Sequence, residues 1–278
     1  MKQNDESALG SFLNEGEYAI EDDFLKYGYK IFEVANKEAL DRIRLEIVKL
    51  AANFLQEKIP HDHHYFLSTI HSRVSDKQIN ALRLYIFDAL NAQSWVRAKY
   101  FQCAKTLLDI IVGNELVMQR KVNLSIQMPN DKSSILPVHA DTWSGDSPYE
   151  VVLWLPFVDV AKTQSMFILP MAKNQLHVAA MEKKGISKTQ EIMDEIKGDV
   201  IWLELTYGQG VIFTQNVMHG NVLNEEKTSR WSCNCRFKSV FSPYADKKIG
   251  EFFEPITLKP ATRLGADYEL PDFSTLKE

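Results

Sequence analysis

Residues 150–158 read EVVLWLPFV, a short run of β-branched and aromatic side chains that predicts a strand. Similar segments precede and follow it, separated by glycine, proline and asparagine. They are LVMQRKVNLSIQM (116–128), SMFILP (165–170), DVIWLEL (199–205), QGVIFT (209–214) and RWSCNCRFKSVF (230–241). Such a series favours an antiparallel sandwich or barrel with helices packed outside it. We therefore expect an α+β fold with a mainly β core over residues 116–241.

The residues before this core have helical periodicity. Apolar side chains recur at helical spacing from Asn36, a plausible N-cap, to about Gln56. Similar patterns run from Asp76 to about Ala92 and from Ser94 to Val112, before Gly113. The sequence thus predicts a mainly helical region over residues 1–115 in a single domain of residues 1–278, with 242–278 as a C-terminal extension.

A helical insertion at about 171–198 interrupts the strands. Ser187, with Gln190 three residues later, forms a capping-box pattern for a helix that begins there.

Composition restricts the class of protein. The 278 residues are 45% hydrophobic and carry a formal net charge of −5, without a basic block that could follow a phosphate backbone. No apolar run is long enough for a membrane span, and the N-terminus lacks the pattern of a secretory signal. We expect a cytoplasmic protein with a small-molecule substrate and neither nucleic acid nor membrane as partner. Cys103, Cys233 and Cys235 do not indicate a disulfide framework or a zinc site.

Just before the apolar run, residues 137–143 read PVHADTW. In an extended segment, His139 and Asp141 point to the same side and could bind one metal ion, although a surface pair would show the same pattern. His219 lies in a later β-rich segment, beside Gly220, which permits close backbone approach. Two imidazoles and one carboxylate leave open positions on a metal, which suits iron(II) binding a bidentate cosubstrate and O2.

Arg230 and Ser232 share a face of the predicted strand that follows His219. A guanidinium matches a carboxylate in geometry, and the hydroxyl adds a donor, so this pair suits the distal carboxylate of 2-oxoglutarate. An arginine on a strand is otherwise usually a solvated edge charge.

The order His139, Asp141, His219 and Arg230, with RxS at 230–232, resembles the iron(II)- and 2-oxoglutarate-dependent oxygenases, particularly the phytanoyl-CoA hydroxylase-like branch. The resemblance covers roughly residues 116–241. It implies a double-stranded β-helix, or jelly-roll, core with N-terminal helices packed outside. It also implies a dioxygenase (oxidoreductase) that uses Fe(II), 2-oxoglutarate and O2. Hydroxylation is the default outcome; alcohol oxidation, ring closure and desaturation use the same ligands.

A narrower likeness lies in NLSIQMPNDKSSILPVHADTWSGDSPYEVVLWLPFVD, residues 123–159, followed by SMFILP. This stretch is similar to a small subfamily of such oxygenases that is encoded among genes for antibiotic sugars and bacterial surface polysaccharides. The resemblance implies a carbohydrate-related substrate, such as a sugar or sugar nucleotide, in a biosynthetic pathway.

Further polar and aromatic residues are candidates for binding. Asn123 and Gln127 alternate with apolar residues on the strand before PVHADTW and could face the cosubstrate, or they could face solvent. Trp143 and Trp154 could stack on a sugar, although core packing is favoured for Trp154.

Three other interpretations compete with this one. HDHH at residues 61–64 could chelate a metal, but a polar loop after Pro60 is the commoner explanation. His177 has no acidic residue two positions later, which favours a surface role. A cupin-like metal-binding or sugar isomerase protein would use the same barrel without oxygen chemistry, but it would not require Arg230 with Ser232.

Overall fold

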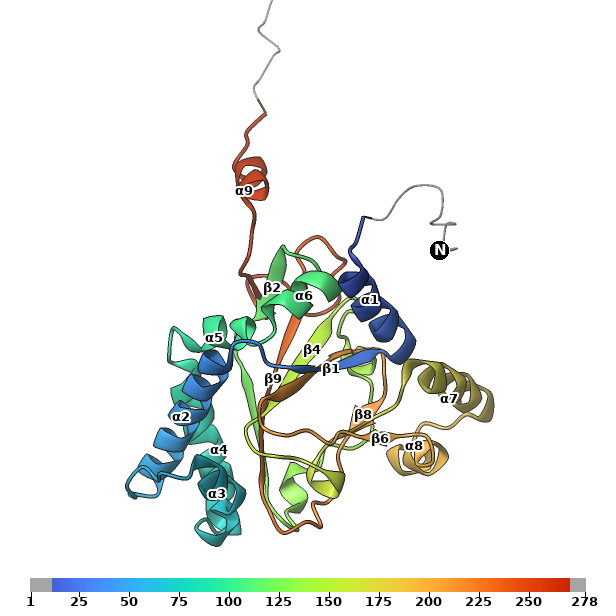
Figure 1. Cartoon of the computed structure of the whole chain (residues 1–278). Helices are drawn as coiled ribbons and strands as arrows, with labels where there is room; N and C mark the ends of the chain where they lie inside the picture. Colours follow the sequence, from blue (N-terminus) through green and yellow to red (C-terminus); the bar gives the residue numbers. More distant parts are fainter. Residues whose placement is uncertain (1–11, 271–278) are drawn as a thin grey trace, which may run out of the picture.

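A computed structural model describes residues 12–270 of the protein (Figure 1). Most helices lie in the first part of the chain and most strands in the second. The helices are α1 (Glu15–Tyr27), α2 (Lys37–Phe54), α3 (His63–Ser68), α4 (Asp76–Asn91), α5 (Val96–Gln102), α6 (Lys105–Ile111), α7 (Met171–Lys184), α8 (Thr189–Ile196) and α9 (Pro260–Ala266). The strands are β1 (Tyr29–Glu33), β2 (Leu116–Gln119), β3 (Asn123–Gln127), β4 (Val151–Pro156), β5 (Phe167–Ile168), β6 (Ile201–Trp202), β7 (Gln209–Thr214), β8 (His219–Gly220), β9 (Arg230–Ser239) and β10 (Phe253–Pro255).

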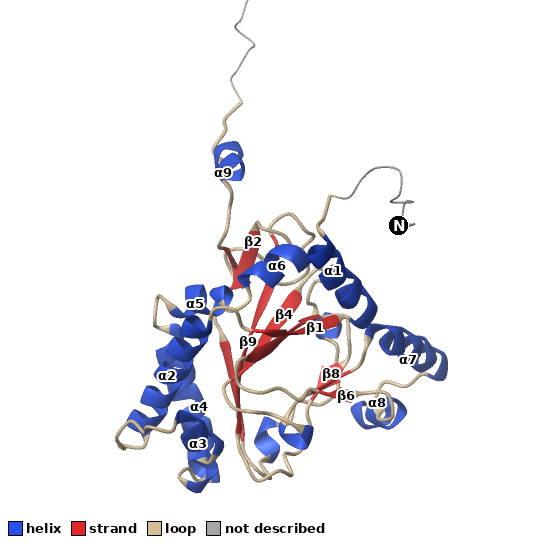
Figure 2. Cartoon of the chain, viewed as in Figure 1, coloured by secondary structure: helices blue, strands red, loops and turns tan. Residues whose placement is uncertain are grey.

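Two antiparallel sheets form the centre of the molecule. The larger has the strand order β1-β7-β4-β9-β2-β10, with β3 paired to β9, and the smaller has the order β6-β5-β8. Figure 2 shows α2, α3, α4 and α5 on one side of these strands and α7 and α8 on the other. The mixed helical and antiparallel architecture expected from the sequence is therefore confirmed.

Strand β9 divides the interior into an apolar side and a polar side. Its odd-numbered side chains Trp231, Cys233, Cys235 and Phe237 are fully buried in the main core. The indole of Trp231 donates a 2.8 Å hydrogen bond to the carbonyl of Leu67 at the end of α3, so this face is turned toward the helices. The even-numbered side chains therefore point into the space between the sheets, because alternate residues of a strand face opposite ways.

The helical layer begins where the sequence predicts. The side chain of Asn36 accepts a 3.0 Å hydrogen bond from the Ala39 amide and caps α2, whose apolar stripe is fully buried. Gly113, with φ of 120°, follows the last turn of α6. The predicted helix from Ser94 to Val112 is divided into α5 and α6, because Ala104 between them has a non-helical φ of −134°.

Some elements differ from the sequence prediction. A strand, β1, lies within the region predicted to be mainly helical and pairs with β7 at the edge of the larger sheet. The predicted capping box at Ser187 is wrong: α8 begins after Lys188, which makes no side-chain capping bond. Helices α7 and α8 nevertheless fill the predicted insertion and cover the smaller sheet with a second apolar cluster that includes Phe167, Met181 and Ile192. None of the helices in residues 12–270 is long and apolar enough to span a membrane.

Candidate active site

His139, Asp141 and His219 bring three potential ligand atoms within 4.8 Å of one another. The Nε2 atom of His139 lies 3.5 Å from Oδ1 of Asp141, and that of His219 lies 3.9 Å from Oδ2. Asp141 and His219 are buried, and His139 is partly exposed. This arrangement is the two-histidine, one-carboxylate set that the sequence predicts, and it is suited to a divalent metal with open coordination positions.

Backbone pairing sets the spacing of the two histidines. The His139 amide donates to the His219 carbonyl at 3.0 Å, and the His219 amide donates back at 2.8 Å. The two rings consequently lie with their centroids 4.4 Å apart. Residues 80 positions apart in the chain thus become neighbours through an isolated bridge between the HxD segment and β8.

A hydrogen bond to the backbone also fixes the Nδ1 atom of each imidazole. Nδ1 of His139 donates to the Pro137 carbonyl at 2.8 Å, and Nδ1 of His219 donates to the Val217 carbonyl at 3.0 Å. Because a carbonyl only accepts, each Nδ1 must carry the hydrogen, and each neutral ring then presents a free lone pair at Nε2. Such bonds orient the imidazole of a metal ligand.

Gly220 and Asn221 hold the two segments together next to His219. A Cβ at Gly220 would lie 2.8 Å from the Leu136 carbonyl oxygen and 3.0 Å from the Phe167 ring, so only glycine fits. The Asn221 side chain accepts from the Leu136 amide at 2.6 Å and donates to the Ser134 carbonyl at 3.1 Å. The metal-ligand geometry therefore depends on close backbone approach.

The ionisation of the ligands favours a cation between them. Burial acts to raise the pKa of Asp141, but the hydrogen bond with His139 and the charges of His219 and Arg236 lower it well below its ordinary value. Burial lowers the pKa of His219 to about 4, against the effect of Asp141. At neutral pH the carboxylate is therefore charged and His219 is neutral, which are the forms that bind metals.

The ligands open into a cavity of about 420 Å³ between the two sheets. Apolar side chains that line it are Leu136, Val152, Trp154, Met166 and Phe213, and polar ones include Asn123, Ser125, Asn221 and Asn234. The cavity combines apolar walls with a few convergent polar groups, as small-molecule sites do.

Arg230 lies in this cavity and has no carboxylate partner among residues 12–270. It is 3% exposed, and within the described part of the chain its guanidinium donates only to the Ser125 hydroxyl at 3.2 Å and the Gln164 carbonyl at 3.4 Å. Its Nε and the hydroxyl of the buried Ser232 have no hydrogen-bond partner in the structure. Burial lowers the pKa of Arg230 to about 10, so the group stays charged at neutral pH. A buried, unpaired guanidinium is costly, and an anionic ligand would compensate it.

The other residues predicted for binding take different positions. Asn123 and Trp154 line the cavity, and Trp154 is also 4% exposed, as core packing requires. Gln127 is fully buried but donates to the Val222 carbonyl at 2.6 Å and does not line the cavity. Trp143 is 48% exposed, and Ser144 of the same short 3-10 helix, rather than Trp143, lines the cavity.

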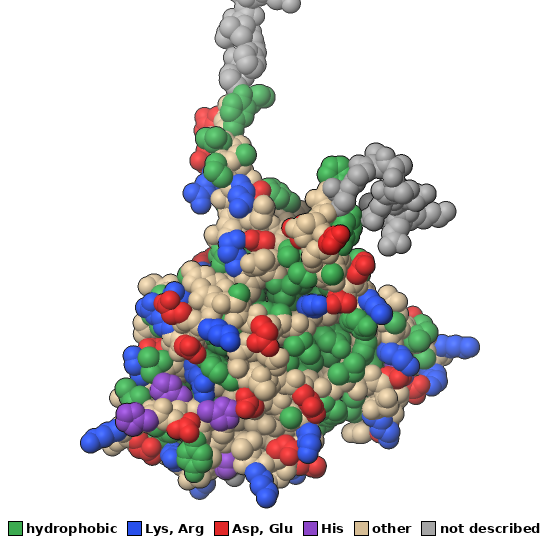
Figure 3. Space-filling view, in the orientation of Figure 1, with side chains coloured by type: hydrophobic (Ala, Val, Ile, Leu, Met, Phe, Trp, Pro, Cys, Tyr) green, Lys and Arg blue, Asp and Glu red, His purple; other side chains and the backbone are tan. Residues whose placement is uncertain are grey.

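The competing histidines do not form a second metal centre within residues 12–270. Histidines at the surface gather over α2 and α3 in Figure 3, where Asp62 caps α3 through the Tyr65 amide at 2.8 Å. The Nε2 atom of His177, on α7, lies 2.8 Å from Oδ2 of Asp199, and His177 does not line the cavity. His63 and His64 thus begin helix α3 instead of lying in the polar loop that the sequence favours, and His177 is partly buried in an ion pair instead of free at the surface.

Arg236, Asp146 and Lys247 line the same cavity but were not predicted as site residues. Arg236 donates from Nη2 to Oδ1 of Asp141 at 3.2 Å, and Asp146 contacts both Arg236 and Lys247. The sequence pattern could have indicated Arg236, since Arg236 shares a face of β9 with Arg230. No sequence pattern connects Lys247 to the site, because it reaches the cavity from the segment after β9.

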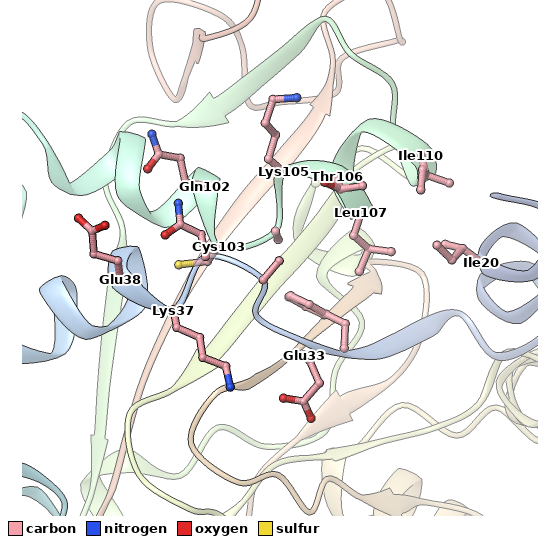
Figure 4. Close-up of a pocket in the computed structure, with 14 residues that line it drawn as sticks. Ile20, Glu33, Lys37, Glu38, Gln102, Cys103, Lys105, Thr106, Leu107 and Ile110 are labelled. Atoms are coloured by element: carbon pink, nitrogen blue, oxygen red, sulfur yellow. The ribbon is translucent and has the colours of Figure 1, made fainter. Parts of the chain in front are cut away.

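A larger hollow of about 690 Å³ lies elsewhere, between α1, the start of α2, and α5 and α6 (Figure 4). Its labelled side chains include Glu33, Lys37, Cys103 and Leu107. Cys103 is buried, which raises the pKa of its thiol to about 12 and leaves it unreactive. This hollow does not contain the metal-ligand group.

Known structures share this architecture. The apo form of ThoJ, described as a non-heme monooxygenase, matches with a TM-score of 0.54 and 15% identity over 86% of this chain and 84% of its own. AviO1 from Streptomyces viridochromogenes Tue57 matches with a TM-score of 0.52 and 14% identity over 82% and 97%. SnoK, a non-heme alpha-ketoglutarate-dependent carbocyclase from nogalamycin biosynthesis, matches with a TM-score of 0.51 and 12% identity over 88% of this chain and 97% of its own.

At these identities the likeness shows a common fold. No family model and no curated protein matches the sequence. The chain therefore has the fold of these non-heme enzymes together with its own two-histidine, one-carboxylate group, and the expected cofactors Fe(II), 2-oxoglutarate and O2 are consistent with that group.

Proposed function

We propose that this chain is an iron(II)- and 2-oxoglutarate-dependent dioxygenase of the phytanoyl-CoA hydroxylase-like branch, with a double-stranded β-helix core. The observation that carries the proposal is one cavity with two complementary features. It contains a largely buried group of candidate metal ligands, His139, Asp141 and His219, and a buried guanidinium, Arg230, that lacks an anion among residues 12–270. A metal-binding protein without a keto-acid cosubstrate would not require the second feature.

Different residues of the cavity would bind the metal and the cosubstrate. Nε2 of each histidine and the Asp141 carboxylate would hold the iron and leave three positions open. Arg230 and the hydroxyl of Ser232 would bind the distal carboxylate of 2-oxoglutarate, since both have unsatisfied donors. When bound, iron and 2-oxoglutarate supply activation of O2 coupled to formation of succinate and carbon dioxide, with hydroxylation of a substrate C–H bond as the default outcome.

The protein itself orients the candidate metal ligands. Hydrogen bonds from Nδ1 to the carbonyls of Pro137 and Val217 fix the ligand rings, and Phe213 packs edge-on against His219 with ring centroids 4.8 Å apart. Asp141 also argues against halogenation, which requires the carboxylate position for a halide.

For the substrate we propose a carbohydrate-related small molecule of a bacterial sugar or polysaccharide pathway. Support comes from the resemblance of residues 123–159 and from the cavity walls. Amide and hydroxyl side chains of Asn123, Asn221, Asn234 and Ser144 can bind sugar hydroxyls, and Trp154 offers an aromatic wall.

The experiment is succinate formation from 2-oxoglutarate, with iron(II) and O2, across a panel of nucleotide sugars and aminoglycoside precursors. Before oxygen is added, anaerobic titration of the iron-loaded protein with 2-oxoglutarate should produce the visible charge-transfer band of keto-acid chelation. A wild-type protein that binds iron but shows no band and forms no succinate would refute the proposal and favour a cupin-like protein.

A further inference from the structure

Arg236, Asp146 and Lys247 form a charged cluster at the side of the cavity next to Asp141. Lys247 forms an ion pair with Oδ1 of Asp146, and the same oxygen lies 3.3 Å from Nε of Arg236. Arg236 and Arg230 occupy the same face of β9, six residues apart, which is about 20 Å along a strand. The two arginines therefore serve different regions of the cavity.

The charges that line the cavity do not balance. Its walls carry three cations, Arg230, Arg236 and Lys247, and two carboxylates, Asp141 and Asp146, apart from the two ligand histidines. Behind the walls lie buried Lys238 and buried Glu150, and burial raises the pKa of Glu150 to about 7, so that this pair adds no net negative charge. The sum leaves at least one positive charge in a protein whose formal net charge is −5.

Bound cofactors would leave the excess positive charge of the cavity unchanged in size but would change where it lies. A divalent metal and the doubly charged 2-oxoglutarate cancel each other in the sum. The metal engages Asp141, and the cosubstrate engages Arg230. One carboxylate, Asp146, then remains between two cations, Arg236 and Lys247, so the uncompensated charge lies at this cluster.

Arg236 also has donors to spare. Within residues 12–270, the only hydrogen bond of its side chain runs from Nη2 to Asp141, and its buried Nε lacks hydrogen-bond geometry to Asp146. A guanidinium has five N–H donors, so most of them are free for a ligand. Lys247 is a quarter exposed and can turn its ammonium toward a bound anion.

We propose that the cluster of Arg236 and Lys247 binds an anionic group, a phosphate or a carboxylate, of the substrate. This inference rests on the proposed function, because it takes Arg230 to be occupied by the cosubstrate. It narrows the substrate to a hydroxyl-bearing small molecule with at least one negative charge. The anion would bridge Arg236 and Lys247 beside Asp146, and the asparagine side chains of the wall would meet its hydroxyls.

Anaerobic calorimetry on protein loaded with iron(II) and 2-oxoglutarate tests this inference. The probes are sulfate and the matched sugars glucose 6-phosphate, glucuronate and glucose. We expect sulfate to bind, and Lys247→Gln to weaken it about tenfold or more. The matched control is Lys248→Gln, an exposed neighbour, which should bind sulfate as the wild type does. The two charged sugars distinguish a phosphate site from a carboxylate site, and neutral glucose should bind more weakly than either.

Lys247→Gln is the decisive variant because Lys247 contacts no metal ligand, whereas Arg236 bonds to Asp141. If sulfate does not bind the wild type, or binds Lys247→Gln equally well, the anion site is refuted. The preceding 2-oxoglutarate titration reports on the proposed function separately. A normal 2-oxoglutarate titration with no sulfate binding overturns only the substrate inference. If 2-oxoglutarate fails to bind, sulfate is still titrated, and loss of affinity in Lys247→Gln still supports the anion site.

Discussion

Arg236 holds one oxygen of the Asp141 carboxylate, with its Nη2 atom 3.2 Å from Oδ1, while the His219 ring faces the other oxygen at 3.9 Å. The carboxylate that would bind a metal is thus fixed in orientation from β9. This contact also places a permanent positive charge next to the metal ligands, which the metal must tolerate and which an anionic substrate would offset.

Asp141→Ala should weaken iron(II) binding by more than about a hundredfold, because it removes one of three ligands. The fold should persist, since Asp141 lies in a short 3-10 helix rather than in the main apolar core. Anaerobic metal titration and circular dichroism measure the two effects. His63→Ala is the control and should keep its iron. Loss of iron in that variant would show that the HDHH segment holds the metal.

Arg230→Leu should leave iron bound but weaken 2-oxoglutarate binding by roughly thirty- to a thousandfold, because a charge-assisted contact of this kind contributes about 2–4 kcal/mol. Arg230→Lys should recover only part of the affinity, since lysine keeps the charge but not the planar fork. The measurement is the anaerobic titration that follows the charge-transfer band. Equal affinity in wild type and Arg230→Leu would contradict the cosubstrate assignment.

The same variant has a stability readout. Without cosubstrate, Arg230→Leu should be as stable as the wild type or more stable, because a buried charge without a counter-ion is removed. Thermal unfolding in the absence of 2-oxoglutarate tests this expectation. A loss of several kcal/mol would indicate that Arg230 is mainly structural.

Gly220→Ala should reduce the unfolding free energy by about 1–3 kcal/mol and weaken metal binding as well. The new methyl group would meet the Leu136 carbonyl oxygen at 2.8 Å and separate the segments that hold His139 and His219. Gly198→Ala is the control, because no atom lies within 4 Å of its added Cβ. Urea unfolding and metal titration of both variants provide the test. Similar behaviour of the two would mean that close approach at Gly220 is unimportant.

Glu150 should make stability depend on pH. Burial, opposed by the hydrogen bond from the Ser147 amide and reinforced by the charge of Asp146, raises the pKa of this carboxyl to about 7. The folded state then binds the proton more tightly than the unfolded state, whose pKa is the ordinary 4.5. Stability from this group is therefore full below pH 4.5 and is lost as the pH rises to about 7, by up to about 3 kcal/mol.

Glu150→Gln should remove this part of the slope, so its stability relative to the wild type should increase between pH 5 and pH 8. Denaturant unfolding at several pH values measures the difference. Glu251→Gln, at an exposed carboxylate, is the control and should follow the wild type at every pH. A constant difference between Glu150→Gln and wild type would show that Glu150 is ionised in both states.

The sequence by itself determined the elements and the ligand types. Helical spacing after Asn36 and the β-branched runs from Leu116 to Phe241 predict the two layers, because burial requires apolar residues at the period of each element. The pairs His139 with Asp141 and Arg230 with Ser232 were also accessible, since the members of each pair are two residues apart in the chain, although Asp141 begins a short 3-10 helix instead of continuing an extended segment. The alternation of side chains along β9 also places Arg236 on the face of Arg230, although the sequence does not indicate the role of Arg236.

Only the tertiary structure decided which distant groups meet. The bridge between His139 and His219 results from backbone pairing across 80 residues, and no local pattern specifies that pairing. Lys247 reaches the cavity from the segment after β9, and Gln127 bonds to Val222 instead of lining the cavity. Strand pairing and the loss of solvent around Arg230 are properties of the folded chain, because they depend on contacts between segments rather than on the residues of one segment.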